Sequence, residues 1–74
     1  MKKMNLTAVL ERENDGFVSL CPELDVASQG NTVKEAVTNL REAVGLFLET
    51  ADTAEIEERY KGEVFVTHFE AVYA

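Results

Sequence analysis

The chain has 74 residues, of which 46% are hydrophobic and 28% are charged. This length is close to the lower limit at which one hydrophobic core can stabilise a fold, so residues 1–74 are expected to form a single domain and to leave no room for a C-terminal DNA-binding domain. Fourteen acidic residues against seven basic ones give a formal net charge of −7, which disfavours direct binding to DNA or RNA because such binding depends on cationic side chains.

The sequence contains no apolar stretch long enough to be a membrane span, and residues 1–4 do not start a signal-peptide hydrophobic region. A single cysteine, Cys21, cannot form an internal disulfide, which agrees with a reducing compartment. The sequence therefore predicts a cytoplasmic protein that does not bind a membrane.

The first residues have the pattern of a β-hairpin. Apolar side chains alternate from Met4 to Arg12, which is the period of a β-strand. Residues 14–16, Asn-Asp-Gly, tolerate the positive φ of a tight turn. Residues 17–21 then form a second strand that is long enough to pair back on the first, and Pro22 ends it because proline lacks a backbone N–H.

A third strand and a long helix are expected next. Residues 24–29 are compatible with an extended edge strand, which the pair 30–31, Gly-Asn, interrupts. Residues 32–35, Thr-Val-Lys-Glu, form a capping box that fixes the start of the helix. From there apolar residues repeat at spacings of three and four as far as Ala51 and form one stripe, while Gly45 lies off the stripe and is interpreted as a tolerated surface glycine.

The last quarter of the sequence predicts a short helix and a final strand. Residues 52–55, Asp-Thr-Ala-Glu, can cap one or two helical turns, which Gly62 ends. Residues 63–69 are rich in β-branched and aromatic side chains, which favour a strand. The order strand, strand, strand, helix, strand predicts an α+β domain of two layers, β-β-β-α-β, with the short helix placed before the last strand.

The strands are apolar on both faces, whereas one amphipathic helix can cover only one face. In the second strand, for example, Val18 and Leu20 alternate with Phe17 and Cys21. The second face is either shielded by the short helix or buried in a partner. Together with the bare edges of a short sheet, this pattern predicts a homodimer or a larger even-numbered assembly.

The sequence from about residue 4 to residue 50 resembles the HicB family. The resemblance rests on the runs GFVSLCPEL at 16–24, ASQGNT at 27–32 and KEA at 34–36. In that family a strand runs into a proline-acid-leucine turn, a short strand ends at a glycine and a helix-capping threonine, and an acid-alanine pair opens the helix. This sequence departs from the pattern at Asp25-Val26, where many members have proline-glycine. The residues that carry the motif, as structural positions, are Gly16, Pro22, Glu23, Leu24, Ser28, Gly30, Thr32, Glu35 and Ala36.

The resemblance implies a degenerate, partial ribonuclease-H-like domain and the function of an antitoxin. Such a protein binds a small basic HicA-like toxin, which cleaves messenger RNA, and masks the active site of that toxin. The alternative is a stand-alone HicB-fold protein with a structural or ligand-binding role and no toxin partner. The candidate partner-binding residues are the acids of the hairpin and the following loop, namely Glu11, Glu13, Asp15, Glu23 and Asp25.

No catalytic residue, metal ion or cofactor is expected. A ribonuclease-H-like two-metal site needs carboxylates that converge from several strands, whereas most acids here lie in or beside turns, where solvated charges are common. His68 and Cys21 are each the only residue of their type, so they supply neither a zinc site nor a cysteine-histidine nucleophile with an orienting group. A residual metal-dependent nuclease is the remaining enzymatic hypothesis.

Overall fold

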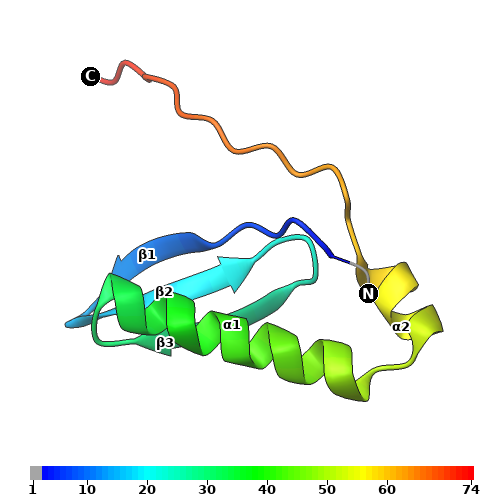
Figure 1. Cartoon of the computed structure of the whole chain (residues 1–74). Coiled ribbons are helices and arrows are strands. Elements are labelled where there is room, and N and C mark those ends of the chain that lie inside the picture. Colours follow the sequence, from blue (N-terminus) through cyan, green and yellow to red (C-terminus); the bar gives the residue numbers. More distant parts are fainter. Residues whose placement is uncertain (1–2) are drawn as a thin grey trace.

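A computed structural model describes residues 3–74 (Figure 1). Three antiparallel strands form a sheet in the order β1-β2-β3, and two helices follow. The long helix α1 packs on one face of the sheet, over β3 and β2 (Figure 1). The predicted α+β class and two-layer arrangement are confirmed. The elements are β1 (Val9–Glu13), β2 (Gly16–Cys21), β3 (Val26–Gly30), α1 (Val33–Thr50) and α2 (Thr53–Arg59).

The hairpin forms where the sequence predicts it, although β1 is shorter than expected. Val9 lies opposite Leu20 in the register, and β2 ends at Cys21, so residues 4–8 have almost no strand left with which to pair. In the turn it is Asn14 that takes a positive φ, 54°, and not the glycine that follows. Asparagine tolerates this left-handed backbone because its short polar side chain can hydrogen-bond locally.

The capping box starts α1 as predicted. The Thr32 hydroxyl accepts a hydrogen bond from the Glu35 amide at 3.0 Å, and the Glu35 carboxylate accepts one from the Asn31 amide at 3.0 Å. The apolar stripe of the helix then faces the sheet. Gly45 is exposed, and a Cβ added to it would meet no atom within 4 Å, which confirms the interpretation of a surface glycine. The core residues are Cys21, Leu24, Ala36, Leu40 and Val44.

Gly30 allows α1 to approach the sheet closely. A Cβ added to Gly30 would lie 2.5 Å from the backbone nitrogen of Ala36, a distance that real side chains do not adopt. At the same contact the Ser19 hydroxyl donates a hydrogen bond to the Ala36 carbonyl at 2.9 Å. These residues therefore set the separation between the first turns of α1 and strands β2 and β3.

The predicted final strand does not form. Residues 60–74 have no regular secondary structure, and the chain after α2 runs in an extended path away from the sheet (Figure 1). We call residues 63–74 the C-terminal arm. The expectation of a strand over 63–69 is wrong for the single chain, because a strand needs a neighbouring strand to pair its backbone N–H and C=O groups, and the arm has none there. Among the described residues, no helix is long and apolar enough to cross a membrane.

Candidate partner-binding surfaces

The acids predicted to bind a partner do not form one continuous rim, because Glu23 is buried. Only 4% of its surface is exposed. Its carboxylate accepts hydrogen bonds from the Thr7 amide at 2.9 Å, from the Thr7 hydroxyl and, at 3.6 Å, from the Cys21 thiol. Glu23 is therefore not part of an exposed acidic rim, since its oxygens are already occupied inside the fold.

The surroundings of Glu23 stabilise its charged form. Burial alone raises the pKa of the Glu23 carboxyl, but the hydrogen bonds from Thr7, from its own backbone and from Cys21 outweigh this effect, so the pKa lies below its ordinary value. Burial also raises the pKa of the Cys21 thiol, and the adjacent carboxylate raises it further. The thiol thus remains protonated and acts as a donor, which is a structural role rather than that of a nucleophile.

The backbone of the same loop holds the end of α2. The Glu23 carbonyl accepts a hydrogen bond from the Lys61 amide at 2.8 Å, and the Leu24 carbonyl accepts one from the Arg59 guanidinium at 3.3 Å. The Arg59 guanidinium also lies 4.9 Å from the centre of the Phe47 ring, in a cation–π contact. The proline-acid-leucine motif is therefore a junction that joins the N-terminal segment, α1 and α2.

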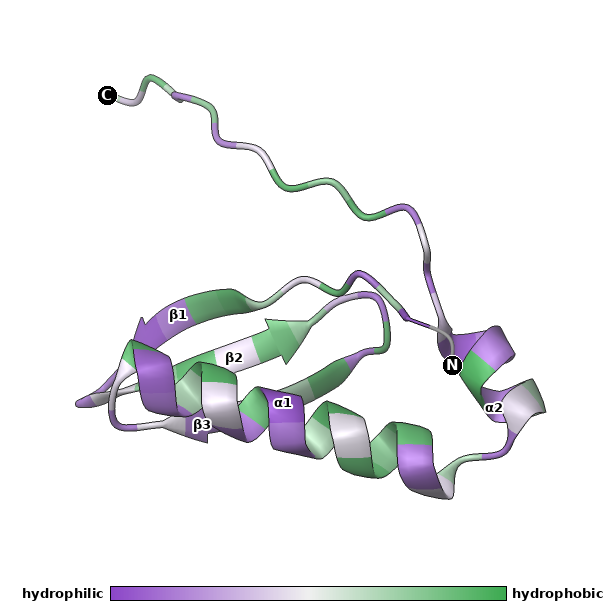
Figure 2. Cartoon of the chain, in the orientation of Figure 1, coloured by the Kyte–Doolittle hydropathy of each residue, from purple (hydrophilic) through white to green (hydrophobic). Residues whose placement is uncertain are grey.

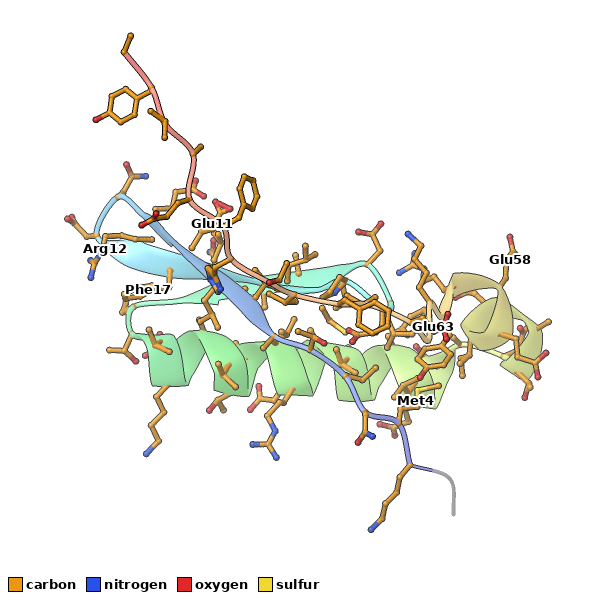
Figure 3. The ribbon with its side chains drawn as sticks, turned by 90° about the horizontal axis from the view of Figure 1, so that it is seen from above. Met4, Glu11, Arg12, Phe17, Glu58 and Glu63 are labelled. Carbon is orange, nitrogen blue, oxygen red and sulfur yellow. The ribbon has the colours of Figure 1, made fainter. Side chains whose placement is uncertain are left out.

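Three of the other predicted acids lie together on the hairpin. Glu11, Glu13 and Asp15 are all exposed, and we call them the acidic edge. The Ser19 side chain points at α1, so its neighbour Val18 points to the opposite face of the sheet. Glu11 lies directly opposite Val18 in the register and therefore shares that face. Glu13, two residues further along β1, points the same way. Figure 3 shows Glu11 on this strand. Asp25 is exposed as well, but it lies at the far end of β2, where it adopts a positive φ of 55°.

The cation within the acidic edge is turned away from it. The Arg12 guanidinium lies over the Phe17 ring, 4.6 Å from the ring centre, on the α1 side of the sheet (Figure 3). The edge is therefore anionic on its open face. Within residues 3–74, no three histidine, cysteine or acidic side chains converge as a metal site requires, and His68 is exposed on the C-terminal arm.

The sheet carries apolar side chains on both faces, and those on the face opposite α1 are only partly covered. Leu20, on the face opposite α1, is 38% exposed. The helix α2 lies at the end of the sheet beside the loop after β2, so it does not shield this face (Figure 1). Of the two coverings that the sequence left open, the short helix is therefore excluded.

The structure also has a groove that the sequence did not predict. It lies between residues 4–8 and α1, and has a volume of about 400 Å³. It arises because α1 sits over β3 and β2 and leaves the β1 side open. The alternation of apolar residues before Val9, which is also typical of a strand, is the signal for this groove in the sequence. The groove is lined mainly by apolar side chains, among them Met4, Leu6, Ala8, Val37, Leu40 and Val44.

A second depression, of about 410 Å³, lies at the opposite end, between the hairpin turn and the start of α1. Its lining is mostly polar and includes the acidic residues Glu13 and Glu35 and no lysine or arginine. Asn39 on its wall donates a hydrogen bond to the Gln29 carbonyl at 2.7 Å. The acidic residues of this lining disfavour anions such as phosphate groups.

No protein-family model matches the chain, and no solved structure matches it. Three bacterial relatives share one family name. The UPF0150 protein ssr1765 of Synechocystis is 44% identical over 48 residues, which cover 62% of this chain and 61% of that protein. The UPF0150 protein ssl0738 of the same organism is 41% identical over 49 residues, which cover 64% of this chain and 68% of that protein. A UPF0150 protein of Helicobacter pylori is 29% identical over 72 residues, covering 96% of this chain and 100% of that protein. The chain therefore belongs to the UPF0150 protein family.

Proposed function

We propose that this protein is a HicB-type antitoxin, which binds a small basic HicA-like toxin and masks the active site with which that toxin cleaves messenger RNA. The proposal includes a partial ribonuclease-H-like domain without enzymatic activity of its own. It rests on the resemblance of residues 16–36 to the HicB family. The observation that carries it is the acidic edge of the hairpin, which is exposed and not neutralised by Arg12.

The charge of the acidic edge suits such a partner. An RNA-cleaving toxin has to attract phosphate groups and therefore presents cations around its active site. Three carboxylates within five residues of one hairpin, Glu11, Glu13 and Asp15, offer an anionic surface that can occupy those cations. The net charge of −7 extends this attraction beyond direct contact and speeds the encounter at low salt.

The buried motif residues leave partner contact to the exposed acids. Leu24 and Ala36 are fully buried, and Glu23 is held by hydrogen bonds within the fold. These residues maintain the hairpin and the helix in their relative positions. The side chains available to a toxin are therefore those of the acidic edge together with Asp25, which is also exposed.

The test is to look for a small basic protein encoded by an adjacent gene and to measure the kinetics of binding to it at several ionic strengths. The double variant Glu11→Gln/Asp15→Asn is expected to slow association at low salt on the order of tenfold and to flatten the salt dependence, because charges at a rim act mainly on the on-rate. A control matched in charge is the double variant Glu57→Gln/Glu58→Gln on α2, where Glu58 lies far from the hairpin (Figure 3), and it should have a much smaller effect.

Two results would contradict the proposal. If no such neighbour is encoded, or if binding is indifferent to salt and to the acidic edge, a stand-alone structural or ligand-binding protein of the same fold is the better explanation. If the purified chain cleaves RNA with Mg²⁺ or Mn²⁺, the non-enzymatic part of the proposal fails.

A further inference from the structure

The C-terminal arm has the composition of a buried strand but no cover. Phe65 and Phe69 are each 88% exposed, Val72 is 100% exposed and Tyr73 is 94% exposed. Figure 2 shows these hydrophobic stretches on the segment that runs away from the folded body. Contiguous apolar surface of this kind is rare on monomeric proteins and usually marks an interaction site. The arm is thus a segment that needs a partner surface.

The base of the arm is fixed to the folded body. Tyr60 packs against the core, and its amide donates a hydrogen bond to the Ile56 carbonyl at 2.9 Å. The next residue, Lys61, donates to the Glu23 carbonyl at 2.8 Å. Only Gly62 and Glu63 separate this anchor from the apolar run that begins at Val64. From the anchor the arm leaves on the β1 side of the sheet and diverges from it (Figure 1).

The same chain offers a surface that fits such a strand. In the sheet order β1-β2-β3, strand β1 pairs with β2 and with no other segment of residues 3–74, so its outer edge is open there. Beside this edge lies the apolar groove between residues 4–8 and α1. A strand added there would hydrogen-bond to the free backbone groups of β1 and would cover the groove with its side chains.

We propose that the arm of one copy adds as a strand to the β1 edge of a second copy and covers its groove, with the second arm doing the same in return. The two exchanged arms make a symmetric, closed dimer, since the same two surfaces meet twice. Each sheet then has four strands, the fourth being the strand that the sequence predicts over 63–69. The dimer requires no toxin, so this inference stands or falls separately from the proposed function.

The dimensions and charges favour a second copy as the occupant. Residues 64–73 of the arm are as many as residues 4–13, which comprise the open edge strand β1 and the groove-lining segment before it, so the arm is long enough to lie along the whole of that segment. Arg41 lines the groove and is opposite in charge to the arm acids Glu63 and Glu70, while the acids of β1, Glu11 and Glu13, point to the other face of the sheet. Three aromatic side chains bury roughly 450–750 Å² per arm. Two arms therefore bury about 900–1,500 Å², which overlaps the lower part of the range of about 1,200–2,000 Å² that stable interfaces have.

The first test is light scattering of the full chain at tens of micromolar. We expect twice the mass of the 8.2 kDa chain. Phe65→Asp and Phe69→Asp should each weaken dimerisation at least tenfold, because a carboxylate cannot be buried in the groove without cost. Circular dichroism should show that both variants remain folded. Leu46→Asp is the matched control, since Leu46 is also an exposed apolar residue, 62% exposed, but lies on α1 away from the arm.

The second test identifies which chain the arm covers. A dimer mixed from isotope-labelled and unlabelled chains should give nuclear Overhauser effects between arm protons of one chain and groove protons, such as those of Leu6 and Leu40, of the other. Contacts within one chain only would mean that the arm folds back on its own β1, which would overturn the proposal. A monomer at this concentration, or a dimer that is indifferent to both arm substitutions, would also overturn it.

Discussion

The folded body and the C-terminal arm are both rich in apolar residues, but only the body buries them. In the body, Leu24 and Leu40 are enclosed because α1 lies against β2 and β3 of the same chain. In the arm, Phe65 and Phe69 have no neighbouring strand within the described part of the chain, residues 3–74. A strand-like sequence forms a strand only where an adjacent strand is available to pair with its backbone groups. Substitutions in the body should therefore affect mainly the unfolding equilibrium, and substitutions in the arm should affect mainly dimerisation.

The largest loss of stability is expected from Leu24→Ala. Leu24 is completely buried in the core, so truncating it removes buried apolar surface and leaves a cavity, at a cost of about 2–5 kcal/mol. Urea unfolding followed by circular dichroism measures the change. Leu46→Ala, on the exposed face of α1, is the control and should cost well under half as much. Equal effects at the two positions would mean that the core does not lie beneath the loop after β2.

Glu23→Gln is expected to lower the free energy of unfolding by about 1.5–3 kcal/mol at pH 7, which is typical for hydrogen bonds to a charged group. The effect should depend on pH. Because the folded pKa of Glu23 lies below its ordinary value near 4.5, the unfolded chain binds its proton first as the pH falls.

The stabilisation by ionised Glu23 is therefore fully present above about pH 4.5 and is lost as the pH falls through the lower pKa of the folded state. The free energies of unfolding of the wild-type protein and the Glu23→Gln variant, measured from about pH 7 down to about pH 3, should converge in the acid range. A difference that stays constant over the whole range would show that the charge of Glu23 does not contribute.

Gly30→Ala should cost about 1–3 kcal/mol, because the added methyl group would collide with the backbone of Ala36 and force α1 away from β3. Gly45→Ala makes the same change in open space in the middle of α1 and should instead stabilise the protein by up to about 1 kcal/mol. Thermal unfolding of both variants tests the pair. Destabilisation of the same size at both positions would contradict the close contact at Gly30.

The smallest effect is expected from Val72→Asp in the arm. Val72 is fully exposed, so at concentrations low enough to dissociate a dimer this change should alter the free energy of unfolding by less than about 0.5 kcal/mol. Unfolding measured over a range of protein concentrations provides the test. A loss of stability that is equally large at every concentration would indicate that the arm packs on its own body, and the contrast between the two regions would disappear.

The features that the sequence predicted correctly depend on neighbours close in the chain. The start of α1 follows from Thr32 and Glu35, which are three residues apart, and its buried face follows from the spacing of apolar residues. The hairpin likewise depends on a two-residue turn at 14–15 between strands β1 and β2. In these segments the structure favoured by residues close in the sequence is the one found in the fold.

The features that the sequence did not predict depend on distant residues. An acid beside Pro22 in a turn is normally solvated, and only the fold brings Thr7, 16 positions away, to the Glu23 carboxylate. The signal for a buried Glu23 was its place in the HicB-like motif, directly before Leu24, which is a core residue. The final strand predicted over residues 63–69 is absent from the single chain for a similar reason, because residue pattern alone does not supply a neighbouring strand.

The double attachment at Glu23 also has a consequence for how the molecule opens. Its side chain holds the Thr7 amide, and its backbone carbonyl holds the Lys61 amide, so one residue secures segments near the two ends of the folded body. A local opening of the loop after β2 would release both amides together. The Thr7 and Lys61 amide protons should therefore exchange with solvent deuterium with one opening free energy and one denaturant dependence, as a single cooperative unit, although they are far apart in the sequence.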